Sequence, residues 1–287
     1  PFVSNSNCFV VPPMRFATES CLVMEEVIKA GMPVLLLSAG QAGATAPASI
    51  AGTVAQAVSE ILAGLVYVNS IKPGHPCICG TWPFVSDLRT GAMSGGSGEQ
   101  GLLTACCAQI LKSFELPSGA AAGMADSKLP DAQSGYEKGS TAVMAGLSGL
   151  NLVYESVGMH ASLLGFCLES MIIDNDMLGQ CLRCVRGVEV NNKTLSFEAI
   201  KDVCIGGPGH YLGHEQTLSV MESEYVYPSI SDRSSPKEWN ENGRPELLDT
   251  AQIEVKNILD NFTPKHIPND LSSNIYQNHN ILFKVKN

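Results

Sequence analysis

Short apolar runs alternate with long amphipathic stretches along the first 185 residues of this 287-residue chain, and this alternation most constrains its fold. The apolar runs are Cys8–Val11, Val34–Leu37, Pro76–Gly80, Ser118–Gly123 and Asn151–Tyr154. Each is followed by a segment whose apolar residues recur at helical spacing. A repeating strand–helix unit of this length builds a parallel sheet with helices packed outside it. In such folds the functional residues collect at the carboxyl ends of the strands.

The helical segments complete this α/β pattern. Helices are predicted over Thr18–Ala30, Gly52–Asn69, Gly98–Glu115 and Ala132–Leu147, and within Leu163–Val185. After Gly187 the alternation stops, and three further helices are predicted over Ser196–Cys204, His214–Glu224 and Leu247–Phe262. We therefore divide the chain into a partial β/α barrel over 1–187, a helical portion packed on it over 188–265, and a loose tail over 266–287.

The number of repeating units is too small for a closed parallel barrel. About five strand–helix units are visible, whereas a TIM-type (β/α)8 barrel has eight. Either the sheet is open or the first units are absent, and the start on Pro1 directly before strand-like sequence favours a fragment. An open sheet edge invites pairing with another copy, so a homo-oligomer is expected.

Composition narrows the class of function. The net charge of −10 argues against nucleic-acid binding, because no basic stripe offsets it. The longest apolar stretch, Val54–Val68, is interrupted by Gln56, Ser59 and Glu60, so no membrane span is predicted. The ten cysteines are interpreted mostly as buried free thiols of a cytoplasmic protein, because disulfide-framed secreted domains are smaller.

Two candidate segments follow the third and fourth predicted strands. The glycine-dense run Gly91–Glu99 could present backbone N–H groups to an anion at a helix N-terminus, or could be a tightly packed loop. It has neither the Gly-Lys-Ser/Thr of a phosphate-binding loop nor the spacing of a dinucleotide fingerprint. Asp126, Lys128 and Asp131 follow the next strand and could form the polar wall of a pocket or a solvated loop with a helix cap.

Two more segments combine histidine with tyrosine. Tyr154, Glu155 and His160 follow the last strand and could transfer protons or hold a cation, although a structural histidine is the alternative. His210 and Tyr211 lie in a glycine-rich turn, but no carboxylate or cysteine completes a zinc-ligand spacing there. Cys181-x-x-Cys184 has no second pair, so no metal site is predicted.

Four motifs together resemble the trimethylamine methyltransferase (MttB-type) superfamily. They are GAMSGGSGE at 91–99, KLPDAQSGYEK at 128–138, NLVYESVGMHAS at 151–162 and GGPGHYLG at 206–213. The resemblance runs from about residue 5 to about residue 265 and implies a TIM-barrel methyltransferase. Such enzymes move a methyl group from a quaternary or tertiary methylamine to the cobalt of a corrinoid that a separate corrinoid protein carries, so no tightly bound cofactor is expected in this chain.

One departure from the family pattern bears on the substrate. The trimethylamine-specific members carry pyrrolysine, whereas this sequence contains only standard residues. The resemblance therefore implies a non-pyrrolysine member that acts on glycine betaine or a related quaternary amine. Family members are also considerably longer than this chain, which agrees with the fragment expected from the strand count.

The resemblance also implies roles for the candidate residues. Glu155, His160 and Asp126 form the expected catalytic set, in which the two carboxylates offset the positive charge of the substrate. The aromatic residues expected to face the methylammonium group are Tyr154, Tyr136, Trp82 and Phe166. A substrate carboxylate would be received by His160, by Arg89 or by amides of the glycine-rich loop, including Gly95 and Gly96. Glu99, His210 and Tyr211 complete the expected binding residues.

Two other readings remain open. A barrel remnant could bind the ligand or the corrinoid protein without catalysis, and methyl transfer to free reduced cobalamin would separate this reading from the enzyme. An unrelated barrel lyase or aldolase could use Lys128 as a Schiff-base amine, which borohydride trapping with a carbonyl substrate would detect.

Overall fold

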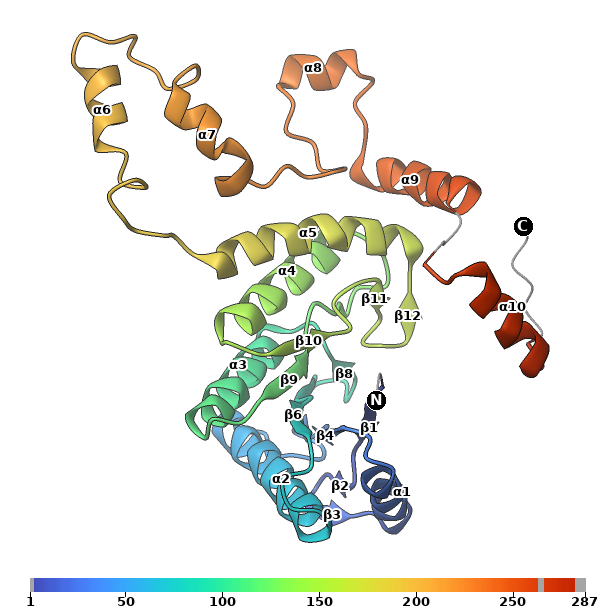
Figure 1. Ribbon diagram of the computed structural model, residues 1–287. Coiled ribbons are helices and arrows are strands. Elements are labelled where there is room, and N and C mark those ends of the chain that lie inside the picture. Colours follow the sequence, from blue (N-terminus) through green and yellow to red (C-terminus); the bar gives the residue numbers. More distant parts are fainter. Residues whose placement is uncertain (1–2, 263–265, 282–287) are drawn as a thin grey trace.

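A computed structural model describes residues 3–262 and 266–281 and places five parallel strands in one sheet (Figure 1). They are β1 (Asn5–Asn7), β4 (Val34–Ser38), β6 (Cys77–Thr81), β9 (Ser118–Ala121) and β10 (Leu152–Tyr154). Their order in the sheet is their order in the chain, and every pairing is parallel. This confirms the predicted α/β class. Among the described residues the sheet stays open, with β1 and β10 as its edges.

The prediction of a first strand over Cys8–Val11 is wrong. The sheet strand is the polar segment Asn5–Asn7, whereas β2 (Val10–Val11) pairs antiparallel with β3 (Arg15–Phe16) in a small hairpin. Phe9 and Val10 are buried in the helix-side core, which explains their apolar character. Apolar sequence therefore marked burial here and not sheet membership, because an edge strand can be polar.

Five helices follow the strands and cover the outer face of the sheet. They are α1 (Thr18–Lys29), α2 (Ile50–Ile71), α3 (Gly98–Ser113), α4 (Ala132–Leu147) and α5 (Leu168–Arg186). The main core packs Val34 and Leu36 of β4 against Met24 of α1, Ile61 of α2 and Leu111 of α3. The α4 boundary matches the prediction because Asp131 caps it, accepting a 2.9 Å hydrogen bond from the Ser134 amide.

One described helix, α2, is long and apolar enough to cross a membrane by length and composition alone. It packs against α3, β4 and β6, and Val54, Ile61 and Val68 are buried within the chain. These contacts make α2 a core helix of the α/β layer.

Besides the β2–β3 hairpin, two small β structures lie in the connections that leave the carboxyl ends of the sheet strands. β5 (Gln41–Ala42), β7 (Phe84–Ser86) and β8 (Met93–Ser94) form one, and β11 (Met159–His160) pairs with β12 (Gly165–Phe166) in the other. Phe84 of β7, Met93 of β8 and Met159 of β11 join Ala121 and Met124 in a small core. Ala42 of β5 belongs to a separate core with residues of α2 and α3. The carboxyl-end side of the sheet is therefore built from ordered loops, and most of the candidate residues lie there.

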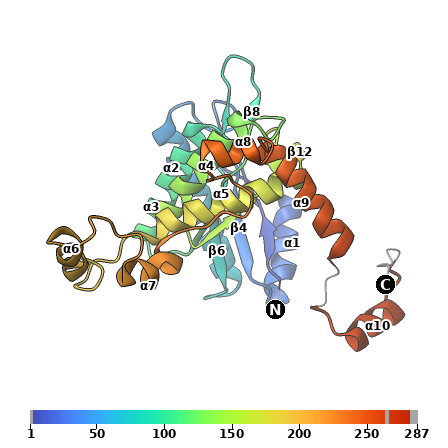
Figure 2. The same ribbon diagram turned by 90° about the horizontal axis from the view of Figure 1, so that it is seen from above.

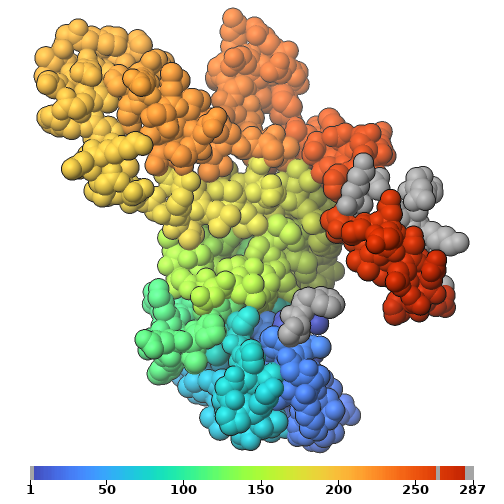
Figure 3. All heavy atoms as spheres, viewed as in Figure 1, coloured from blue at the N-terminus to red at the C-terminus, as the bar shows by residue number. Residues whose placement is uncertain are grey.

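The remaining helices are α6 (Phe197–Cys204), α7 (Glu215–Glu224), α8 (Pro236–Glu241), α9 (Leu247–Asn261) and α10 (Asn269–Asn278). The three predicted helices are present as α6, α7 and α9. α9 packs along α5 and buries Ala251. In Figures 1 and 2, α6 and α7 extend away from the sheet, and Figure 3 shows them as a lobe separate from the one that contains α8. Of the predicted tail, residues 282–287 lie outside the described part.

Candidate functional site

Trp82, Tyr154 and Glu155 form a cluster at the carboxyl ends of β6 and β10, which we call the aromatic–carboxylate cluster. The two strands are separated by β9, yet the rings of Trp82 and Tyr154 lie 5.4 Å apart between centroids. β9 permits this contact because its side chains are small. A Cβ atom added at Gly119 would lie 3.1 Å from the Tyr154 ring.

Each member of the cluster holds a buried polar atom that makes no hydrogen bond of normal geometry with the described residues. These atoms are Nε1 of Trp82, Oη of Tyr154 and Oε2 of Glu155. The Trp82 and Tyr154 groups lie close to each other, so the Trp82 side chain partly opposes the effect of burial on the pKa of Tyr154. Buried polar groups in native proteins are nearly always paired, and an unpaired one costs about 1–3 kcal/mol. Three such atoms in neighbouring side chains mark a place where a bound molecule can supply the missing partners.

The backbone and the electrostatics single out Glu155. Its φ of 63° lies in the left-handed region, which is unusual for a residue other than glycine and is often found at functional sites. Burial raises the pKa of Glu155 and also raises the pKa of Tyr154, because the charged form of each is poorly solvated. A cation beside Glu155 would offset the cost of burying its carboxylate.

Asp126 is surrounded by protein donors. Its carboxylate accepts hydrogen bonds from the amides of Gly95 (2.8 Å) and Gly96 (3.2 Å), from the hydroxyl of Ser162 (2.6 Å) and from the hydroxyl of Ser94. Asp126 therefore ties the glycine-rich loop to the turn at Ser162. The amides of Gly95 and Gly96, predicted as receivers of a substrate carboxylate, are directed to the Asp126 carboxylate.

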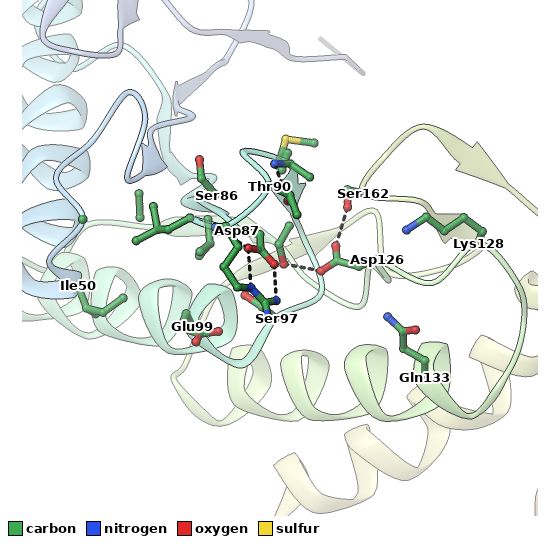
Figure 4. Close-up of a pocket in the computed structure, with 18 residues that line it drawn as sticks. Ile50, Ser86, Asp87, Thr90, Ser97, Glu99, Asp126, Lys128, Gln133 and Ser162 are labelled. Atoms are coloured by element: carbon green, nitrogen blue, oxygen red, sulfur yellow. Dashed lines mark hydrogen bonds and ion pairs between the residues drawn. The ribbon is translucent and has the colours of Figure 1, made fainter.

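Several predicted residues line a cavity of about 710 Å³ near the start of α3 (Figure 4). Arg89, Glu99, Asp126 and Lys128 all contribute to its wall. Arg89 is paired with Asp87 at 2.6 Å and lowers the pKa of that carboxyl. The cavity thus gathers charged side chains, whereas Trp82 and Tyr154 belong to the aromatic–carboxylate cluster.

His160 is placed in the interior. Its side chain is 2% exposed, Nδ1 donates to the Ser127 carbonyl at 3.2 Å, and Nε2 accepts from the Ser170 hydroxyl at 2.6 Å. Burial, together with the nearby Lys138 ammonium, lowers the pKa of His160, which favours the neutral ring. Both ring nitrogens already have protein partners, so this geometry corresponds to the structural histidine that the sequence left as the alternative.

Four other predicted residues lie outside the cluster. Tyr136 is 65% exposed on α4, and Phe166 is 58% exposed on β12. His210 and Tyr211 lie in the connection between α6 and α7, within the segment that extends from the sheet (Figure 1). The structure brings Trp82, Tyr154 and Glu155 together and leaves these four apart from them.

The sequence reasoning missed two buried charged residues of α4. Glu137 accepts hydrogen bonds from the amides of Asp126 (2.8 Å) and Ser127 (3.2 Å). Lys138 forms a buried ion pair with Asp174 of α5. The available signal was their position on the helix, because Ser134, Lys138 and Thr141 recur at the spacing of a buried face. In the described ranges no group of three His, Cys, Asp or Glu residues could hold a metal ion.

Comparisons with known proteins agree with these motifs. A family model described as trimethylamine methyltransferase (MTTB) matches residues 2–279. A glycine betaine methyltransferase of Desulfitobacterium hafniense (strain Y51) is 31% identical over 263 residues, which cover 92% of this chain and 54% of that protein. The trimethylamine methyltransferase MttB of Methanosarcina thermophila is 32% identical over 262 residues, which cover 90% and 53%. The chain spans about half the length of the curated relatives it matches.

Proposed function

Because this chain belongs to the trimethylamine methyltransferase family, we propose that it forms part of an enzyme that transfers a methyl group from a methylated amine to a corrinoid protein. The family membership confirms the resemblance that the four motifs predicted. The corrinoid's cobalt would supply the methyl acceptor, and the partner protein would carry it. The part that this chain contributes is the binding of the methylated cation.

The aromatic–carboxylate cluster is the observation that carries the proposal. A quaternary ammonium group has no N–H to donate, so proteins hold it with aromatic faces and a nearby carboxylate. Trp82 and Tyr154 supply the aromatic faces, and Glu155 supplies the charge. The two unpaired donors, Trp82 Nε1 and Tyr154 Oη, could also bind an oxygen of the substrate. We therefore propose a quaternary ammonium compound that bears a carboxylate, such as glycine betaine.

The chemistry of methyl transfer indicates that Glu155 contributes to substrate binding and not to the rate of the chemical step. As the methyl group leaves, the amine keeps the electron pair of the broken C–N bond and its positive charge disappears. A carboxylate that stabilises this charge therefore stabilises the bound substrate at least as strongly as the transition state. Interactions of that kind lower KM without raising kcat.

The proposed architecture is one part of a (β/α)8 barrel. The sequential order of the five parallel strands and the two open sheet edges support it. We also propose that the barrel portion ends at residue 187 and that the helical portion follows it. We propose a homo-oligomer because an open sheet edge can pair with another copy. A cytoplasmic location fits the ten cysteines, which are all free.

Calorimetric titration with glycine betaine tests the assignment of the cluster. The wild-type chain should bind, and Glu155→Gln should bind at least about tenfold more weakly, which corresponds to about 1.4 kcal/mol. Glu115→Gln is the matched control, because Glu115 is an exposed carboxylate before β9 whose φ of 58° lies in the same backbone region as that of Glu155. Equal affinities of Glu155→Gln and wild type would remove Glu155 from the site.

A second measurement separates an enzyme from a binding module. Methyl transfer to free reduced cobalamin is followed by absorbance, with the wild-type chain and with Glu155→Gln. We expect a higher KM and a nearly unchanged kcat for the variant. Tight binding of glycine betaine without any transfer would favour the non-catalytic reading.

A further inference from the structure

A buried ion pair between α4 and α5 contacts the loop that carries Glu155. Nζ of Lys138, on α4, is 2.6 Å from Oδ2 of Asp174, on α5, and their side chains are 1% and 5% exposed. Burying two charges is costly, so such a pair persists only with close geometry and additional hydrogen bonds. Neither residue lines the 710 Å³ cavity.

The additional hydrogen bond comes from the Glu155 loop. The amide of Gly158 donates to the same Oδ2 atom of Asp174 at 2.7 Å. Gly158 has a φ of +76°, and a Cβ atom there would lie 2.5 Å from the Phe166 ring, so this position requires glycine. The ion pair is therefore hydrogen-bonded to the backbone amide three residues after Glu155.

His160 extends the same network by two residues. Its Nε2 atom lies 3.4 Å from Nζ of Lys138, and its ring also bonds Ser127 and Ser170. The segment from Gly158 to His160 is therefore attached to α4, to α5 and to the connection after β9.

The other backbone bonds of this loop are longer. The amide of Ala122 donates to the Tyr154 carbonyl at 3.3 Å, the amide of Cys167 donates to the Gly158 carbonyl at 3.1 Å, and the amide of Ala125 donates to the Met159 carbonyl at 3.3 Å. A bond to an ionised carboxylate is roughly twice as strong as a neutral one. The bond from the Gly158 amide to the Asp174 carboxylate is thus the strongest of these four bonds between Tyr154 and Met159.

We propose that Asp174 is a positioning residue, which holds Glu155 in the aromatic–carboxylate cluster through its bond to Gly158 and its ion pair with Lys138. This inference rests on the function proposed above. Without the Asp174 charge, the loop loses its strongest anchor, and the Glu155 carboxylate can turn towards water. The affinity for a methylated cation then falls, although Asp174 itself does not touch the ligand.

The chain offers a matched control on the same helix. Asp176 lies two residues after Asp174 and is also buried (6% exposed), but it accepts hydrogen bonds from Ser229, Ile230 and Ser231. Asp174→Asn and Asp176→Asn therefore make the same chemical change on one helix and affect different partners. Asp174→Asn alone leaves the Lys138 ammonium buried without its partner, so this variant can fail to fold. The double variant Lys138→Met with Asp174→Asn removes both charges and replaces it in that case.

The test combines glycine betaine calorimetry with amide hydrogen exchange on the full chain. Asp174→Asn, or the double variant, should bind at least tenfold more weakly and should exchange faster over residues 156–160. Asp176→Asn should keep the wild-type affinity and the wild-type exchange of that segment. In a Trp239→Phe background, where the tryptophan fluorescence comes from Trp82, ligand at the wild-type Kd should change the emission more in Asp176→Asn than in Asp174→Asn.

Two results would overturn the inference: wild-type affinity in Asp174→Asn, or an equal loss in both aspartate variants, which would indicate a general effect of stability. If the wild-type chain binds no glycine betaine, the proposed function fails, and hydrogen exchange alone decides the inference. Faster exchange confined to residues 156–160 in Asp174→Asn would then support the positioning role, and unchanged exchange would reject it.

Discussion

The ring of Trp82 contacts the ring of Tyr154 across an intervening strand, with 5.4 Å between their centroids and 43° between their planes. This contact depends on β9, whose residues Ser118–Ala121 are small enough to leave room above the sheet. The alanine and glycine residues of this strand allow its neighbours to pack closely over it. This tight packing creates the aromatic pair that we propose as part of the ligand site.

A larger residue at position 119 should separate this pair. In Gly119→Val the new Cβ would lie 3.1 Å from the Tyr154 ring and 3.4 Å from Cβ of Leu152. We expect a loss of about 1–3 kcal/mol in the free energy of unfolding, typical of overpacking, and weaker binding of glycine betaine. Urea denaturation and calorimetry measure the two effects. Gly135→Ala is the control, because nothing lies within 4 Å of its Cβ and a helical alanine should stabilise by about 0.4–1 kcal/mol.

Glu155→Gln should make the unliganded protein more stable near neutral pH while it weakens binding. Burial raises the pKa of Glu155 above its ordinary value of 4.5, so the folded chain holds the proton more tightly than the unfolded chain. The carboxylate therefore opposes folding when it is ionised, and this cost disappears as the pH falls through the raised pKa towards 4.5. Urea unfolding of both proteins from pH 4 to pH 8 should show curves that converge at the acidic end. Parallel curves would contradict the assignment.

His160 should make stability depend on pH in the opposite direction. Its pKa is lowered by burial and by Lys138, so the unfolded chain binds the proton more readily than the folded chain. The neutral ring contributes fully to the free energy of unfolding above pH 6.5, the ordinary pKa of histidine. This contribution is lost as the pH falls towards the lowered pKa. His160→Asn should remove this slope in unfolding measurements between pH 5 and pH 7. A slope equal to that of wild type would indicate that another group titrates.

Asp176 should hold the segment at 229–231 against α5. Its carboxylate accepts bonds from three backbone amides and from the hydroxyls of Ser229 and Ser231. These bonds keep the pKa of Asp176 below its usual range although burial opposes this effect. Asp176→Ala should cost about 1.5–3 kcal/mol, typical of hydrogen bonds to a charged group. Limited proteolysis should then cut faster between residues 187 and 246, and an unchanged cleavage pattern would contradict the prediction.

The sequence placed Tyr154 and Glu155 correctly at the end of a strand because the signal for this position is local. Both residues lie where an apolar strand ends, and the carboxyl end of a parallel strand is a recurrent position for functional residues. The α4 helix was also predicted within its exact bounds, Ala132–Leu147, because the Asp131 cap is three residues from its partner Ser134. Signals that span a few residues can be read from order alone.

The environments of Asp126 and His160 could not be predicted from local sequence. Both lie near the predicted strand ends, but their partners come from distant parts of the chain. Asp126 is saturated by residues about 30 positions before it and 36 positions after it, and His160 by Ser127 and Ser170. His210 and Tyr211 belong to a motif that supports the family assignment, yet the fold places them between α6 and α7. No local pattern contains these long-range distances.

The sequence by itself determined the α/β class, the parallel pairing and the family, because apolar periodicity and short motifs are properties of neighbouring residues. Only the tertiary structure decided which polar groups have partners. It enclosed Asp126 and His160 in hydrogen bonds, paired Lys138 with Asp174, and left buried atoms of Trp82, Tyr154 and Glu155 without partners. The physical reason is that hydrogen bonding and desolvation depend on distances of a few ångströms between residues far apart in the chain.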